Sequence, residues 1–203
     1  MRSGIADLKM PLRRQLEVFV PADDAEALHR RRMLELIDSA IHGSDPFSRG
    51  HFTPGHFTAS AFVLSPDLRR LLLIFHSKFH RWLQPGGHID PGDAHVASAA
   101  RREVLEEAGL EVQLRVLDPF DLDIHAIPAN AAKNEPAHEH FDVRFLFVAS
   151  ADAHVAGSDA KEARWVPLDQ VTQELTDASV TRAVRKLRTV AVCRGSDADQ
   201  PPR

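Results

Sequence analysis

The sequence of 203 residues has little cysteine, no long apolar run and no excess of positive charge. Its single cysteine, Cys193, cannot form an internal disulfide, so a disulfide-stabilised secreted scaffold is excluded and a cytoplasmic location is expected. No stretch approaches the roughly 20 apolar residues of a membrane-spanning helix. The N-terminal segment before Pro11 also lacks the apolar core of a signal peptide.

The charge balance also narrows the class of partner. There are 25 Lys and Arg residues and 29 Asp and Glu residues, a net charge of −4, which argues against a nucleic-acid-binding surface because such surfaces are basic. Hydrophobic residues make up 43% and charged residues 27%, which are ordinary values for a globular protein. We therefore expect a small-molecule ligand and no membrane or nucleic-acid partner.

The periodicity of apolar residues predicts a mixed α/β domain in which helices cover a sheet. Helical spacing and Asp or Gly caps predict three helices. β-rich runs between turn residues predict the strands. The expected helices are 21–41, 97–108 and 179–192, and the expected strands are 58–64, 71–75, 112–117, 120–127, 140–149 and 164–166. The segment 85–92 is expected to interrupt regular structure, and 47–57 to form a lid or a packing loop.

The helix expected over 97–108 carries three acidic residues on one face. Glu103, Glu106 and Glu107 stand at positions i, i+3 and i+4, within an arc of about 100°. Like charges at this spacing repel one another, and a hard divalent cation with oxygen ligands would offset the repulsion. The glycines Gly86 and Gly87 just before the helix let main-chain carbonyls approach the same ion. The pattern therefore predicts a Mg²⁺ site in a phosphoryl-processing enzyme.

The same stretch resembles the Nudix box, G-x5-E-x7-R-E-U-x-E-E-x-G-U, where U is a bulky aliphatic residue. Gly87 matches the first glycine and Asp93 stands at the position of the first acid. Eight residues, instead of seven, separate Asp93 from the arginine, which we interpret as one residue inserted within 94–98. The second half of the motif matches without a gap at Arg102, Glu103, Val104, Glu106, Glu107, Gly109 and Leu110.

The resemblance implies a Nudix-type α/β/α sandwich with a mixed sheet over 58–192, preceded by an N-terminal helical extension over 1–57 and followed by a disordered tail over 193–203. It implies hydrolysis of a phosphoanhydride in a nucleoside-diphosphate-linked compound by a metal-activated water. By position, the Gly86 carbonyl and the three glutamates would hold Mg²⁺ or Mn²⁺. One glutamate would act as general base, and Arg102 would pair with an acid. A homodimer through the N-terminal helix is also expected.

A second polar cluster is predicted on the strand 120–127 and in the segment 138–145, which leads into the strand 140–149. Alternation places Asp121, Asp123 and His125 on one face of the first strand and residues 138, 140, 142 and 144 on one face of the second. If the strands pair antiparallel, these faces meet. We predict that they form a substrate-facing wall of His125, His138, His140, Asp142 and Arg144. The three histidines could alternatively hold a separate Zn²⁺ ion.

Two other functions are compatible with the same motif. A diphosphate-ester isomerase would keep the metal but release no phosphate or nucleotide. A non-catalytic sensor would bind a nucleotide-like ligand without turnover, although such a module could lose its acids and this chain retains all three. The sequence does not distinguish the leaving group or the general base.

Overall fold

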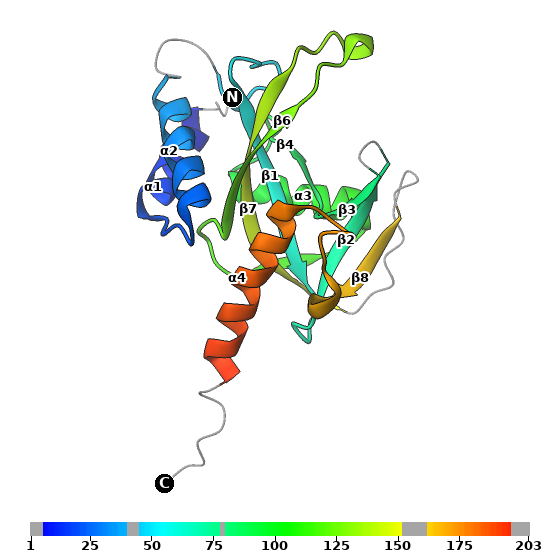
Figure 1. Cartoon of the computed structure of the whole chain (residues 1–203). Helices are drawn as coiled ribbons and strands as arrows, with labels where there is room; N and C mark the ends of the chain where they lie inside the picture. Colours follow the sequence, from blue (N-terminus) through cyan, green and yellow to red (C-terminus); the bar gives the residue numbers. More distant parts are fainter. Residues whose placement is uncertain (1–5, 40–44, 78–79, 152–161, 196–203) are drawn as a thin grey trace.

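The computed structural model describes residues 6–39, 45–77, 80–151 and 162–195. A mixed sheet lies between α3 behind and α4 in front, and α1 and α2 pack beside it (Figure 1). None of the described helices is long and apolar enough to cross a membrane. The elements are α1 Ala6–Val18, α2 Asp24–Ser39, β1 Gly55–Leu64, β2 Arg70–His76, β3 Arg81–Leu83, β4 Gly86–His88, α3 Val96–Ala108, β5 Val112–Leu114, β6 Asp121–Ile127, the 3-10 turn Ala131–Lys133, β7 His138–Ala149, β8 Ala163–Pro167, the 3-10 turn Leu168–Gln170 and α4 Ala178–Gly195.

The long strands β1 and β7 form the centre of the sheet. They pair in parallel from Gly55↔Glu139 to Leu64↔Val148. The other edge of β1 pairs antiparallel with β4 near its start and with β2 near its end. The other edge of β7 pairs antiparallel with β6 and β5, while β3 and β8 flank β2. The α/β sandwich with a mixed sheet is thereby confirmed.

The two faces of β1 are covered by different helices. Phe57, Ala59, Ala61 and Val63 share a buried core with the apolar side of α3 and with α1 and α2. Phe62 and Leu64, which alternate with them, share a second core with α4. The start of the α4-facing side is polar instead of apolar, because it carries His56, Thr58 and Ser60. This polar end of the sheet lies next to β4 and belongs to the sites described below.

The N-terminal helix α1 is absent from the prediction. Its Leu8, Leu12 and Leu16 follow a four-residue period and are buried against the core, but Pro11 lies inside the helix and favours a boundary in the sequence. The predicted helix 21–41 is confirmed as α2, in which Asp23 Oδ1 accepts the Glu26 N–H at 2.8 Å; residues 40–44 lie outside the described part.

Several boundaries also differ from the prediction. The segment 85–92 was expected to interrupt regular structure, but Gly86–His88 form β4 because their main chain pairs with β1. The short strand β3 was not predicted, and β5 ends at Leu114 instead of 117. The first predicted strand begins at Gly55. The last helix continues through 193–195, and the remainder of the expected tail, 196–203, is outside the described residues.

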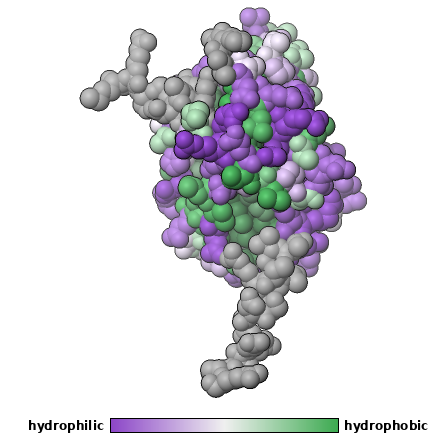
Figure 2. Space-filling model, turned by 90° about the vertical axis from the view of Figure 1, so that its left-hand side faces the viewer, coloured by the Kyte–Doolittle hydropathy of each residue, from purple (hydrophilic) through white to green (hydrophobic). Residues whose placement is uncertain are grey.

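The face that carries α1 and α2 is mostly hydrophilic, with hydrophobic atoms gathered in its lower part (Figure 2). Val18 and Val20, at and just beyond the end of α1, are 67% and 81% exposed. Single exposed apolar residues are common on monomers, so this exposure does not define an interface. The homodimer expected from the sequence stays a prediction.

Candidate active site

The helix α3 has an apolar side and an acidic side. Its alanines and Val104 are buried against β1, and Gly109 ends the helix in a left-handed conformation with φ 64°. The three glutamates lie on the other side with graded exposure. Glu106 has a side chain 56% exposed, Glu103 13%, and Glu107 is buried. The carboxylates of the helix therefore range from one at the protein surface, Glu106, to one in the interior, Glu107.

The loop glycines meet these carboxylates directly. The Gly86 N–H donates to Glu107 Oε2 at 3.1 Å. A Cβ atom at position 87 would lie 2.5 Å from Glu103 Oε1, so a side chain there would displace the carboxylate. At position 86 a Cβ would lie 2.3 Å from Ser60 Oγ on β1. Glycine at both positions allows the loop to fit between β1 and the acidic side of α3.

Arg102 organises the acids around this loop. Its guanidinium donates from Nε to Asp93 Oδ1 at 3.3 Å and from Nη2 to Asp93 Oδ2 at 3.0 Å. The Nη1 atom donates to Glu103 Oε1 at 2.9 Å and to Glu106 Oε2 at 3.1 Å. Arg102 also donates to the His88 carbonyl at 2.9 Å, which links the helix to the end of β4.

The extra residue between Asp93 and Arg102 does not separate the pair. A tight turn holds Asp93, because its N–H donates to the Asp90 carbonyl at 2.9 Å and its Oδ2 accepts the Asp90 N–H at 2.8 Å. The helix begins only at Val96, so the additional length lies in the turn. Asp93 thus takes the place of the longer acid by approaching Arg102 from this turn.

The electrostatics of the acidic side match a cation site. Burial raises the pKa of Glu103 above its usual range, the charge of Arg102 opposes this shift, and the neighbouring charges of Glu107 and Glu106 add to it. The donors offered are carboxylate oxygens, which suit Mg²⁺ or Mn²⁺ better than softer ions. A glycine cradle that any Cβ would fill, beside three carboxylates, fits the metal that the motif implies.

The second predicted cluster forms on the expected face but is mostly buried. The strands β6 and β7 pair antiparallel, with His125 opposite His140 and Asp123 opposite Asp142. Arg144 is 2% exposed and donates to three aspartates, Asp142 at 2.8 Å, Asp123 at 3.1 Å and Asp121 at 3.2 Å. Arg182 and Ser179 of α4 add further contacts to this group. This network joins β6 and β7 to α4.

The histidines of this face gather at the other end of the same strands. One nitrogen from each of His56, His138 and His140 lies within 4.8 Å of the others. The ring of His88 lies 5.1 Å from that of His56, and the ring of His125 lies 5.5 Å from that of His140. Among the described residues, these three histidines are the group whose possible ligand atoms lie close enough together to share one ion. The glutamates of α3 do not form such a group.

Burial lowers the pKa of two imidazoles of this group. It lowers the pKa of His56 to about 4 and that of His140 to about 2, and the neighbouring histidines add to both shifts. The prediction missed His56 and His88, since 47–57 was expected to be a lid or a packing loop. The signal that could have found His56 is the two-residue spacing His56, Thr58, Ser60, which continues the polar face onto β1.

The chain was compared with known proteins. A model of the NUDIX domain matches residues 54–187. A probable DHNTP pyrophosphohydrolase of Lactococcus lactis subsp. cremoris is 31% identical over 133 residues, covering 65% of this chain and 74% of that protein. The asymmetrical bis(5'-nucleosyl)-tetraphosphatase of Rattus norvegicus is 32% identical over 105 residues, covering 51% of this chain and 67% of that protein.

A solved structure shares the fold. The binary complex of a C. elegans Ap4A hydrolase aligns with a TM-score of 0.53 and 20% sequence identity, covering 67% of this chain and 97% of that one. This likeness supports the arrangement of the sheet and helices. With a family model that matches more than half of the sequence, and with the glycine loop, Arg102 and the glutamates of α3 brought together in the fold, the chain belongs to the Nudix hydrolase family.

Proposed function

We propose that this Nudix hydrolase splits a phosphoanhydride bond in a nucleoside-diphosphate-linked compound, in a reaction that depends on Mg²⁺ or Mn²⁺. The observation that carries the proposal is the meeting of Glu107 and Glu103 with the main chain of Gly86 and Gly87, while Arg102 links Glu103 to Glu106 and Asp93. The carbonyl of Gly86 with Glu103, Glu106 and Glu107 would hold the metal.

The residues of the site divide into ligands and a positioning residue. The bound metal would supply positive charge that activates a water and stabilises the phosphate oxygens. One of the glutamates would accept the proton of the attacking water, and Glu106 is the most exposed of them. Arg102 touches two of the glutamates and Asp93, so its role would be to hold the carboxylates in position.

The second cluster supports a more limited substrate role than the sequence predicts. His125, with a side chain 42% exposed, remains a candidate for contact with substrate. Asp142 and Arg144 are buried and satisfied by one another, so we propose that they position β6 and β7 instead of binding substrate. His138 and His140 are considered in the next subsection.

The relatives narrow the substrate class. The names of the two curated relatives refer to a pteridine triphosphate hydrolase and to a dinucleoside tetraphosphatase. Both names describe a phosphate chain attached to a heterocycle. We therefore propose a compound of this class, with two or more linked phosphates, as the substrate of this chain.

A product-release screen tests the proposal. The full chain is incubated with Mg²⁺ or Mn²⁺ and with dinucleoside polyphosphates, dihydroneopterin triphosphate, nucleotide sugars, ADP-ribose, NADH, coenzyme A or nucleoside triphosphates. We expect release of a phosphate or nucleotide product that stops with EDTA and is restored by excess Mg²⁺. The matched control is Glu106→Gln, which should be folded and inactive.

Two results would overturn the proposal. A rearranged diphosphate ester formed without release of phosphate would assign an isomerase. Tight binding of a nucleotide by well-folded, metal-loaded protein, without turnover of any compound in the screen, would assign a sensor.

A further inference from the structure

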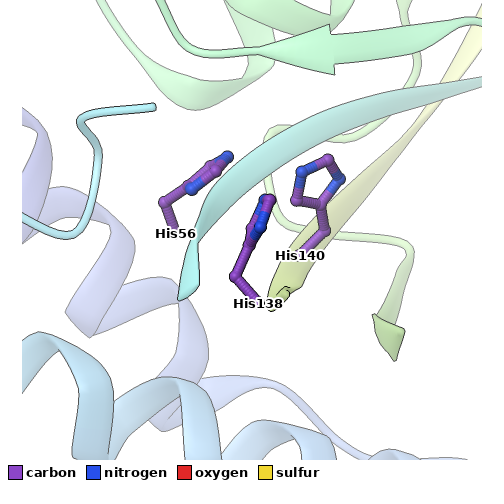
Figure 3. A group of neighbouring side chains, drawn as sticks. All are labelled: His56, His138 and His140. Atoms are coloured by element: carbon purple, nitrogen blue, oxygen red, sulfur yellow. The ribbon is translucent and has the colours of Figure 1, made fainter. Parts of the chain in front are cut away.

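The three clustered histidines come from two strands whose starts lie side by side. His56 of β1 stands directly opposite His140 of β7 in the parallel register, and His138 lies two residues earlier on β7. All three side chains therefore project from the same face of the sheet. Figure 3 shows the three imidazoles close to one another at the starts of the two strands. One nitrogen of each lies within 4.8 Å of the other two.

Main-chain hydrogen bonds orient two of the rings. His56 Nδ1 lies 3.1 Å from the His51 carbonyl, and His138 Nδ1 lies 2.8 Å from the Pro136 carbonyl. In each ring Nδ1 donates to the carbonyl, which leaves the lone pair on Nε2. Metal-bound histidines are held in this way, with the second ring nitrogen donating to a carbonyl or a carboxylate.

The Nε2 atom of His56 has no hydrogen-bond partner within the described part of the chain, although the residue is only 1% exposed. Buried polar atoms in native proteins are satisfied in the great majority of cases, so an orphaned nitrogen beside two other imidazoles needs an explanation. A bound ion would satisfy it.

We propose that His56, His138 and His140 form a second metal site, which takes Zn²⁺ or a similar divalent transition ion. Imidazole nitrogen is a preferred ligand of zinc and a poor one for magnesium, so this site differs in chemistry from the oxygen ligands of α3. Three protein ligands leave a tetrahedral ion a fourth position for a water molecule. The proposal does not depend on the proposed hydrolase function.

The ion would also explain how this end of the sheet is stabilised. His56 and His140 occupy neighbouring positions on strands that are 84 residues apart in sequence, and an ion would link them at the start of β1. Two residues further along β1, Thr58 pairs with His88 of β4. The carbonyl of His88 accepts a hydrogen bond from Arg102. The second metal would therefore lie one strand away from the residues that hold the catalytic acids.

A cobalt titration tests the site. The full chain is stripped with a chelator and titrated with Co²⁺ at neutral pH, and the visible spectrum is recorded. We expect one Co²⁺ per chain with the strong absorption of a four-coordinate ion, displaced by one equivalent of Zn²⁺. Ions bound at the oxygen-rich glutamate site would be six-coordinate and absorb weakly, so the two sites are distinguished.

Matched variants locate the site. His56→Asn and His138→Asn should each abolish the strong cobalt band and weaken zinc binding about a hundredfold or more. His95→Asn, which replaces an exposed histidine before α3, should leave the band unchanged, as should Glu106→Gln. A normal band in both His56→Asn and His138→Asn, or no four-coordinate band in the wild type, would overturn the proposal.

A measurement on the wild type covers the case in which the variants do not fold. X-ray absorption at the zinc edge of protein loaded with one equivalent of Zn²⁺ counts the imidazole ligands. Three imidazoles support the proposal. A shell of oxygen ligands alone would refute it.

Discussion

Two arginines of this protein are each surrounded by several carboxylates, and they differ in exposure. Arg102 forms ion pairs with Asp90, Asp93, Glu103 and Glu106, and its side chain is 25% exposed. Arg144 contacts Asp121, Asp123 and Asp142, and its side chain is 2% exposed. Both groups were predicted from sequence as parts of a functional site.

Burial separates their roles. Around Arg102 the Glu106 side chain is 56% exposed, so this group is open to water and to a metal ion. Around Arg144 the charges are enclosed by β6, β7 and α4, where an unpaired ion would be costly. The comparison indicates that accessibility distinguishes a candidate metal site around Arg102 from a buried structural network around Arg144.

The largest expected effect comes from removing the buried cation. Arg144→Met leaves Arg182 as the remaining cation beside the buried Asp121 and Asp123 and removes the arginine beside Asp142, and breaking a buried ion pair on one side costs about 3–5 kcal/mol. At about 2–4 °C per kcal/mol for a domain of this size, the Tm should fall by about 6–20 °C. Thermal unfolding followed by circular dichroism measures this change.

Arg102→Met is the matched control for that experiment. Its partners are more exposed, so its Tm should fall by less than half as much in metal-free buffer. Equal losses in the two variants would contradict the distinction drawn between the networks.

The second effect concerns activity. Glu106→Gln removes one negative ligand from the exposed rim while keeping the size of the side chain. Because metal catalysis supplies several kcal/mol, we expect turnover to fall about a hundredfold or more. The unfolding free energy should change by less than about 1 kcal/mol, as for other surface substitutions. Steady-state kinetics at saturating Mg²⁺ would show full activity if the assignment is wrong.

The third effect tests the glycine cradle. In Gly87→Ala the added Cβ would lie 2.5 Å from Glu103 Oε1 and force the carboxylate to move. We expect the displaced carboxylate to lower the metal affinity about tenfold. This is the lower end of the range found when residues around a metal site are changed. A Mg²⁺ titration of activity measures it. Gly92→Ala, where a Cβ meets nothing within 4 Å, is the control and should titrate like the wild type.

The smallest expected effect is a change of a few-fold with pH in the Mg²⁺ concentration that gives half-maximal activity. Because burial raises the pKa of Glu103, this carboxyl takes up its proton at a higher pH than an ordinary glutamate does. The protonated form does not bind a cation, so the Mg²⁺ concentration for half-maximal activity should rise as the pH falls from about 7 to about 5. Glu103→Gln should flatten this dependence in the residual activity or in direct metal binding. An equally steep dependence in the variant would contradict the assignment.

The acidic site was predictable because its determinants are local. Glu103, Glu106 and Glu107 lie on one helix, where the spacing alone fixes a common face. Gly109 marks the end of that helix, and Gly86 and Gly87 precede the start of the helix in the sequence. The pairing of β6 with β7 was predictable for a similar reason, because alternation in adjacent strands gives the register of the faces.

The place of His56 beside His138 and His140 and the burial of Arg144 were not predictable because they depend on distant contacts. His56 meets His140 only because β1 and β7 pair in parallel, and the sequence does not specify which strands are neighbours. The alternation of polar and apolar residues predicted the face of the strand on which Arg144 lies. Its burial, however, involves Ser179 and Arg182 of α4, which contact the Arg144 network. The strand β4 was missed because main-chain pairing, and not side-chain pattern, forms it.

Manganese binding tests the central claim most directly, because Mn²⁺ prefers the oxygen ligands of the glutamates and is detected by electron paramagnetic resonance without turnover. Free Mn²⁺ is titrated with the wild-type chain, with Glu106→Gln and Glu107→Gln, and with His138→Asn. The account predicts that both glutamate variants bind Mn²⁺ at least about tenfold more weakly, as expected when a ligand is lost, and that His138→Asn binds it normally. Wild-type affinity in both glutamate variants would contradict the assignment of the catalytic metal to α3.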